Sequence, residues 1–173
     1  MKRLDIKWKC SREFQVGTNS LEQYLKQVQK IVTYHRPSGQ IIITNKNIHH
    51  LVDVWYLIHI VKIPGLNCPF DLPPIESWNV SSVTNMKGLF RNKLRFNEPI
   101  GSWDVSSVTN MESMFRGAHD FNQPLNKWNV SSVTTMEAMF WSAYCFNQPL
   151  EGWDVSKVTN MRFMFHGARE FNQ

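Results

Sequence analysis

The second half of the chain repeats a 25-residue pattern, and ten of its side chains are the candidates for chemistry. They occupy three positions of the pattern at which the residue differs from one copy to the next. Arginine and large aromatic residues are enriched where proteins bind one another. We therefore expect these side chains to bind another protein. The alternative is a solvated surface whose residues vary without consequence. The candidates are Lys87, Arg91, Arg95, Glu112, Arg116, Asp120, Glu137, Trp141, Arg162 and His166.

Catalysis is not indicated by the repeated residues. Serine pairs such as Ser106-Ser107 recur in the second half of the chain, as turn and cap residues do, whereas covalent catalysis needs a single nucleophile. No Ser-His-Asp, Cys-His or phosphate-cradling glycine arrangement recurs with them. The alternative is an enzyme housed in residues 1–66, although that segment holds few candidate acids, bases or nucleophiles. We predict a non-catalytic protein without a cofactor.

A zinc site is suggested by His49, His50, His59 and Cys68, but their spacings match no standard ligand pattern. Adjacent histidines on a helix also point to different faces. The Met-x-x-Met-Phe runs contain soft sulfur ligands, yet their helical spacing is typical of packing residues. We therefore expect no metal site.

Charge is unevenly distributed along the 173 residues. The formal net charge is +5, with ten Lys and Arg against five Asp and Glu up to residue 75, and nine against nine from Glu76 onward. A neutral repeat region does not resemble the basic track that releases counterions from nucleic acid. We therefore expect no nucleic-acid partner.

Neither a membrane span nor a secretory signal is predicted. The most apolar stretch, residues 51–63, is interrupted by Asp53, His59 and Lys62, and it is shorter than the ~20 residues that cross a bilayer. Residues 1–10 alternate charged and apolar side chains, unlike a signal peptide. Three cysteines fit a reducing compartment. A cytoplasmic location is expected, with the cell surface as the alternative.

The elements that must position the candidate residues are repeats of 25 residues. They occupy 78–102, 103–127, 128–152 and 153–173, after a partial unit at 67–77. A fixed period in this range predicts units that stack and share a core. Each unit begins with Trp-x-Val, which indicates a strand, so the tryptophans should form an inward column: Trp78, Trp103, Trp128 and Trp153. Indoles can also form a carbohydrate or peptide platform, but their recurrence beside Val favours a core role.

A short helix is predicted after each strand. Thr84 and its equivalents can cap it, and apolar residues follow at i, i+3 and i+4. The inward face should contain Met111, Phe115, Met136 and Phe140, with Phe121 and Phe146 from the following turn. Asn97, Asn122 and Asn147 recur in that turn and predict a buried asparagine ladder.

Residues 1–66 are predicted to form a separate α/β segment that covers one end of the array. Residues 4–10 read as a strand, residues 20–35 as a helix with a capping box, and residues 40–44 as a buried strand. A second helix is expected to begin at Asn45 or Asn47 and to run past Ile58 to Pro64. Terminal segments of stacked repeats cover apolar faces and strand edges that would otherwise meet water.

The pattern Trp-(Asp/Asn)-Val-Ser-x-Val-Thr-x-Met-x-x-Met-Phe, followed by Ala-x-x-Phe-Asn-Gln-Pro-Leu, resembles the BspA-like leucine-rich-repeat family, the 25-residue class found in mycoplasma lipoproteins. The resemblance covers residues 67–173. It implies an α+β fold: a leucine-rich-repeat-like solenoid of strand–short-helix units with a parallel sheet. It also implies a protein-interaction role, with a cell-surface adhesin as the alternative to an adaptor.

The last repeat ends at Phe171-Asn172-Gln173 without a polar closing unit. If that end is native, exposed core side chains there predict concentration-dependent self-association.

Overall fold

The computed structural model describes residues 43–62 and 72–173. Its helical elements are α2 (Ile48–Tyr56), the π-helical turn η1 (Leu57–Val61) that continues it, and two 3₁₀ turns, η2 (Ile75–Ser77) and η3 (Ile100–Ser102). The predicted strand at 4–10, the helix at 20–35, most of the strand at 40–44 and part of the partial unit at 67–77 lie outside the described residues.

Helix α2 forms where apolar residues recur at helical spacing, and Ile48, Leu51, Val52 and Trp55 are buried on it. This confirms the helix predicted after Asn47. The capping atom differs from the expectation, because the Asn47 Oδ1 atom accepts the backbone N–H of Thr44 (2.8 Å). The helical segment ends at Lys62, which has a left-handed φ of 51°.

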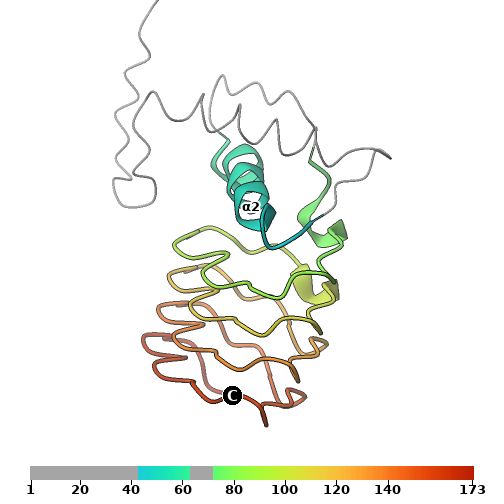
Figure 1. Ribbon diagram of the computed structural model, residues 1–173. Helices are drawn as coiled ribbons and strands as arrows, with labels where there is room; N and C mark the ends of the chain where they lie inside the picture. The colour runs from blue at the N-terminus through green and yellow to red at the C-terminus, as the bar shows by residue number, and fades with distance from the viewer. Residues whose placement is uncertain (1–42, 63–71) are drawn as a thin grey trace, which may run out of the picture.

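The predicted fold class is wrong. The described residues contain no β-sheet, and their one α-helix is α2, so a leucine-rich-repeat-like solenoid with a parallel sheet is not what the chain forms. Instead the repeats lie over one another as successive turns below α2 (Figure 1). Isolated parallel bridges connect them at one position of the unit, joining Asn85 to Asn110, Asn110 to Thr135 and Thr135 to Asn160.

The predicted short helices are also wrong, because the backbone N–H groups have other acceptors. In the second unit, the N–H groups of Ser113 and Phe115 donate to the carbonyls of Glu137 and Met139 in the next unit (2.8 and 2.9 Å). The intervening Met114 donates within its own turn to Met111 (3.2 Å). This alternation replaces the i to i−4 bonds of a helix. Left-handed φ values at Ser113 (56°) and Gly117 (70°) also break a helical path.

The predicted threonine caps instead join the repeats. Both the N–H and the hydroxyl of Thr109 donate to the Thr84 carbonyl (2.8 and 3.2 Å), and Thr134 and Thr159 repeat this arrangement one unit further on. Polar groups that a helix would satisfy locally are therefore satisfied 25 residues away.

Indole N–H groups make a second set of bonds between units. Trp103 donates to the carbonyl of Ile75, Trp128 to that of Ile100 and Trp153 to that of Leu125, over 2.9 to 3.1 Å. All four repeat tryptophans are buried, Trp78 included.

The asparagine ladder is present, but it is not buried. Asn97 is exposed, while Asn122 and Asn147 are half-buried. The Asn97 Oδ1 atom accepts the N–H of Asn122 (2.9 Å), and the Asn122 Oδ1 atom accepts that of Asn147 (2.9 Å). The ladder runs along the surface because its donors are backbone groups of the exposed turn.

The core consists of residues one period apart in contact with each other. Phe90, Phe115 and Phe140 stack with ring centroids 5.4 Å apart, and Phe121 and Phe146 stand in a second column 5.9 Å apart. Met111 and Met136 are fully buried in the same cluster. Stacked rings bury a large apolar area and add favourable offset contacts.

The segment around α2 covers the first repeat (Figure 1). The Asn45 Oδ1 atom accepts the N–H groups of Thr84 and Asn85 (2.9 and 3.1 Å), where later repeats use a carbonyl of the preceding unit. Lys93, which is 7% exposed in its side chain, forms an ion pair with Asp53 of α2. A side-chain oxygen and an ion pair thus tie this segment to the stack.

The last repeat has the most exposed apolar residues of the described chain: Val155 (37% exposed), Met161 (42%) and Phe163 (49%). Self-association through this end stays a prediction.

Candidate protein-binding surface

Two kinds of side chain alternate along the turns of each repeat. In the second unit, Met111, Met114 and Phe115 are buried, whereas Glu112 and Arg116 are partly exposed. The same alternation places Trp141 and His166 on the outside of the third and fourth units, one and two periods after Arg116. Residues that differ between repeats therefore lie in a column on the surface.

Five outward side chains of this region form one group, which we call the arginine–aromatic cluster: Arg116, Trp141, Arg162, Phe163 and His166. The Arg116 guanidinium lies over the Trp141 ring, 4.4 Å from its centroid. The Trp141 ring contacts the rings of Phe163 (5.3 Å) and His166 (4.7 Å, edge to face). The Arg162 guanidinium lies 5.5 Å from the Phe163 ring centroid.

The two arginines of the cluster form no ion pair within the described residues. The ion pairs among the described residues are Lys87 with Glu112 (2.8 Å) and Lys93 with Asp53. Nearby Glu137 accepts a hydrogen bond from the Asn160 amide (2.8 Å). Arg116 and Arg162 therefore contact aromatic rings rather than carboxylates. A cation–π contact uses none of the N–H donors of a guanidinium in an ion pair.

A smaller group of the same kind lies at another position of the repeat. The Tyr144 ring stacks on His119 (4.2 Å between centroids), and the Arg169 guanidinium lies 4.3 Å from the Tyr144 ring centroid. The outer surface of the stack thus holds two groups of aromatic rings with arginine above them.

The structure brings only some of the ten predicted residues together. Arg116, Trp141, Arg162 and His166 belong to the cluster. Lys87 and Glu112 form an ion pair with each other, and Glu137 bonds to Asn160. Arg91 is exposed one period before Arg116, while Arg95 and Asp120 are exposed at a different position of the repeat.

Sequence reasoning missed Phe163, which joins Arg162 to Trp141. Its equivalents are Gly88, Ser113 and Ala138, so a phenylalanine at this position was the available signal. The position has a left-handed backbone in each repeat, with φ of 58° at Phe163. A side chain there costs about 1–2 kcal/mol. The equivalents Ser113 and Ala138 are buried, whereas Phe163 in the last repeat is 49% exposed.

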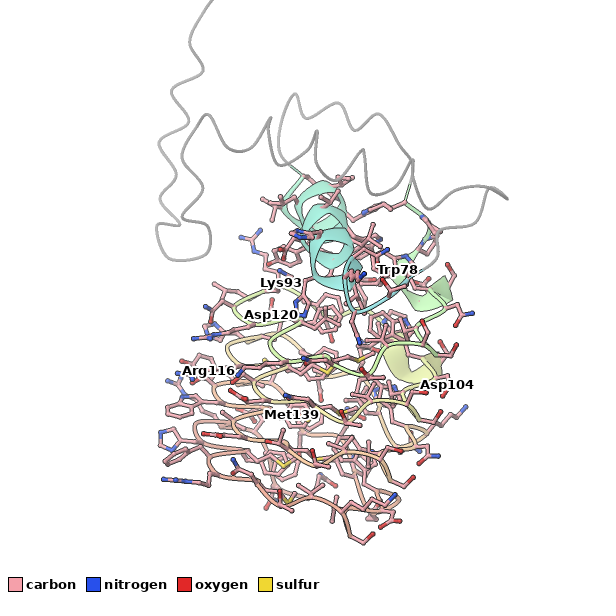
Figure 2. The ribbon with its side chains drawn as sticks, in the orientation of Figure 1. Trp78, Lys93, Asp104, Arg116, Asp120 and Met139 are labelled. Carbon is pink, nitrogen blue, oxygen red and sulfur yellow. The ribbon has the colours of Figure 1, made fainter. Side chains whose placement is uncertain are left out.

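The opposite edge of the stack is built from short polar turns. In Figure 2, Arg116 lies at one edge and Asp104 at the other, with Met139 between them. The Ser106 hydroxyl and N–H both donate to the Asp104 Oδ1 atom (2.6 and 3.1 Å). These hydrogen bonds hold the pKa of the Asp104 carboxyl below its ordinary value, the hydroxyl contributing most. The repeated serines here act in turns.

A protein family described as "Mycoplasma protein of unknown function, DUF285" matches residues 66–173. The chain belongs to this family. No curated protein and no solved structure matches the chain. Membership in the DUF285 family covers all four repeats and the whole arginine–aromatic cluster, but it assigns no activity.

Two further properties of this DUF285 member concern membranes and metals. None of the helices described at 43–62 and 72–173 is long and apolar enough to span a bilayer. Within the same ranges, no three His, Cys, Asp or Glu side chains gather as a metal site would require. Of the suggested zinc ligands, His59 stacks on Trp55 with ring centroids 4.6 Å apart. Burial lowers the pKa of His49. Cys68 lies outside the described residues.

Proposed function

We propose that this protein is a non-catalytic binding module that holds another protein against its arginine–aromatic cluster. The observation that carries the proposal is the contact of Trp141 with Arg116, Phe163 and His166 on an outward surface. Tryptophan and arginine dominate binding energies at protein interfaces. The resemblance of the repeats to BspA-like proteins supports an interaction role.

The division of labour within each repeat supports the same proposal. Inward residues such as Phe115 and Phe140 are fully buried and keep their type from unit to unit, so they serve the stack. The outward position of Arg116 changes to Trp141 and then to His166. A regular scaffold with individual outward side chains suits recognition by an extended surface.

The serine hydroxyls give no support to a catalytic alternative. The hydroxyls of Ser81, Ser106 and Ser131 donate to the side chain two residues before them, over 2.6 to 2.8 Å. A hydroxyl used in this way stabilises a turn. An activated nucleophile instead donates to a base that is itself oriented by a third group.

The test is affinity capture with quantitative mass spectrometry on three forms of the full chain. The cluster variant is Trp141→Ala with Phe163→Ala, and the control is Lys127→Gln, an exposed residue in the turn before Trp128. Circular dichroism first verifies that all three are folded. We expect a protein that the wild type and the control capture and the cluster variant does not. Identical captured sets for all three forms would refute the proposal.

A further inference from the structure

We infer that the partner segment bound at the arginine–aromatic cluster is acidic and extended, with carboxylates that contact the guanidinium edges of Arg116 and Arg162. This inference rests on the proposed function and specifies the chemistry of the partner. It follows from the charge, the ring contacts and the spacing of the arginines.

The charge argument begins with the absence of ion pairs for these arginines. Within residues 43–62 and 72–173, the carboxylates of Asp53 and Glu112 are engaged by lysines, and no carboxylate pairs with Arg91, Arg116 or Arg162. Three cations thus remain without an ion pair, in a region whose nine Lys and Arg equal its nine Asp and Glu in number. A partner that brings carboxylates to them gains charge-assisted hydrogen bonds.

The ring contact leaves Arg116 able to bind a carboxylate. The guanidinium of Arg116 lies over the Trp141 ring, with its Cζ atom 4.4 Å from the ring centroid, and its N–H donors have no carboxylate partner among the described residues. Two parallel N–H groups of a guanidinium match the two oxygens of a carboxylate. The stacking also restricts the side chain before binding, which reduces the entropy lost on binding.

Spacing decides the shape of the partner. Arg91, Arg116 and Arg162 belong to the first, second and fourth units, which are joined by parallel backbone hydrogen bonds. Parallel chains joined in this way lie about 4.8 Å apart, so the three positions extend over about 15 Å. An extended segment of about five residues covers that length. The rings of Trp141 and Phe163 between the arginines offer apolar contact to its other side chains.

Single-stranded nucleic acid also binds surfaces that combine arginine with aromatic rings. The acidic neighbours favour a protein partner, because Glu112, Glu137 and Asp120 stand at outward positions of the same units. A continuous phosphate backbone would meet these carboxylates at each step, whereas a peptide can place its own carboxylates only at the arginines.

The test is fluorescence anisotropy of the full chain with three labelled probes. The first is a twelve-residue peptide of Gly and Ser with Glu at alternate positions, the second is the same peptide with Gln, and the third is oligo(dT). We expect the Glu peptide to bind at least about tenfold more tightly than the Gln peptide, since hydrogen bonds to charged groups contribute most. We also expect its affinity to fall as salt screens the exposed charges.

Variants locate the site. Arg116→Gln should weaken the Glu peptide about tenfold or more, whereas Lys127→Gln, which removes the same charge from a different turn, should change its affinity less than about threefold. Four outcomes would overturn the inference. The Glu and Gln peptides bind equally, neither peptide binds, the two variants have equal effects, or oligo(dT) binds more tightly than the Glu peptide. One of these outcomes can occur while the affinity capture still finds a protein whose binding requires Trp141 and Phe163. In that case the proposed function stands and only the acidic partner is rejected.

Discussion

Truncating one phenylalanine in the middle of the stack should destabilise the protein more than truncating its equivalent in the last repeat. Phe115 is fully buried and stacks on Phe90, Phe121 and Phe140, with ring centroids 5.4, 4.0 and 5.4 Å away. Phe165 is only partly buried, and its stacked rings are Phe140 (5.6 Å) and Phe171 (3.9 Å). The two side chains thus differ by one neighbouring repeat.

The magnitude follows from these contacts. Replacing a buried phenylalanine with alanine costs about 3–5 kcal/mol, and we expect Phe115→Ala to fall in this range. Phe165→Ala removes two ring pairs fewer, because Phe115 also stacks on Trp128 (6.3 Å between centroids). Each pair is worth about 0.5–1.5 kcal/mol, and Phe165 also loses less burial. We therefore expect the free energy of unfolding to fall by about 1–3 kcal/mol less for Phe165→Ala than for Phe115→Ala.

Urea denaturation followed by tryptophan fluorescence measures both losses, since each repeat carries a buried tryptophan. The slope of the transition should stay constant if the unfolding remains cooperative. Equal losses for the two variants would refute the reasoning, because they would mean that contact with the next repeat contributes nothing measurable at Phe115.

Three further predictions concern single contacts. Gly117→Ala should lower the free energy of unfolding by more than about 1 kcal/mol, because Gly117 has φ of 70° and a Cβ atom would lie 2.7 Å from the Asn92 Oδ1 atom. Gly152→Ala is the control, since the nearest atom to its Cβ would lie 3.4 Å away, and it should change Tm little. Equal shifts in Tm for the two variants would contradict this account. Asp53→Asn should lower the free energy of unfolding in urea by more than about 2 kcal/mol, because it leaves the buried Lys93 charge without its carboxylate. Glu112→Gln removes the carboxylate of the more exposed Lys87 pair and should lower it by less than about 1 kcal/mol. A larger loss for Glu112→Gln than for Asp53→Asn would contradict this expectation. Ser106→Ala should raise the pKa of Asp104 in an NMR titration, since the hydroxyl that stabilises the carboxylate is lost. The lowered pKa in the folded state means that this stabilisation is present above pH about 4 and is lost as the pH falls through the folded pKa; an unchanged pKa in the variant would show that the hydroxyl bond has no effect.

The sequence predicted which residues meet better than it predicted the backbone that carries them. A constant period of 25 residues predicts that residues one period apart meet, as Phe115 and Phe140 do (5.4 Å between ring centroids), so the inward positions can be read from the alignment. The i, i+3, i+4 spacing of Met111, Met114 and Phe115 indicated a helix. A run of turns whose alternate N–H groups donate to the next repeat gives the same spacing, and the acceptors are too distant in sequence to appear in a local pattern.

A signal for the turns was nevertheless present. Gly117 and its equivalents Asn92, Ser142 and Gly167 are residue types that tolerate or favour turns, and all four have left-handed φ values. Because such residue types favour turns over helix, these positions argue against the short helix predicted in each of the four repeats. For the candidate site, comparison of equivalent positions found Arg116, Trp141 and His166, but it missed Phe163 because contacts between neighbouring outward positions depend on the turn geometry.

The most direct test of the stacked arrangement is the acceptor of the Phe115 amide. The structure has this N–H donate to the carbonyl of Met139, 24 residues later, over 2.9 Å. A scalar coupling across the hydrogen bond in NMR identifies the acceptor. A coupling from the Phe115 nitrogen to the Met139 carbonyl carbon is expected, whereas a coupling to the Met111 carbonyl would mean a helix and would contradict the account.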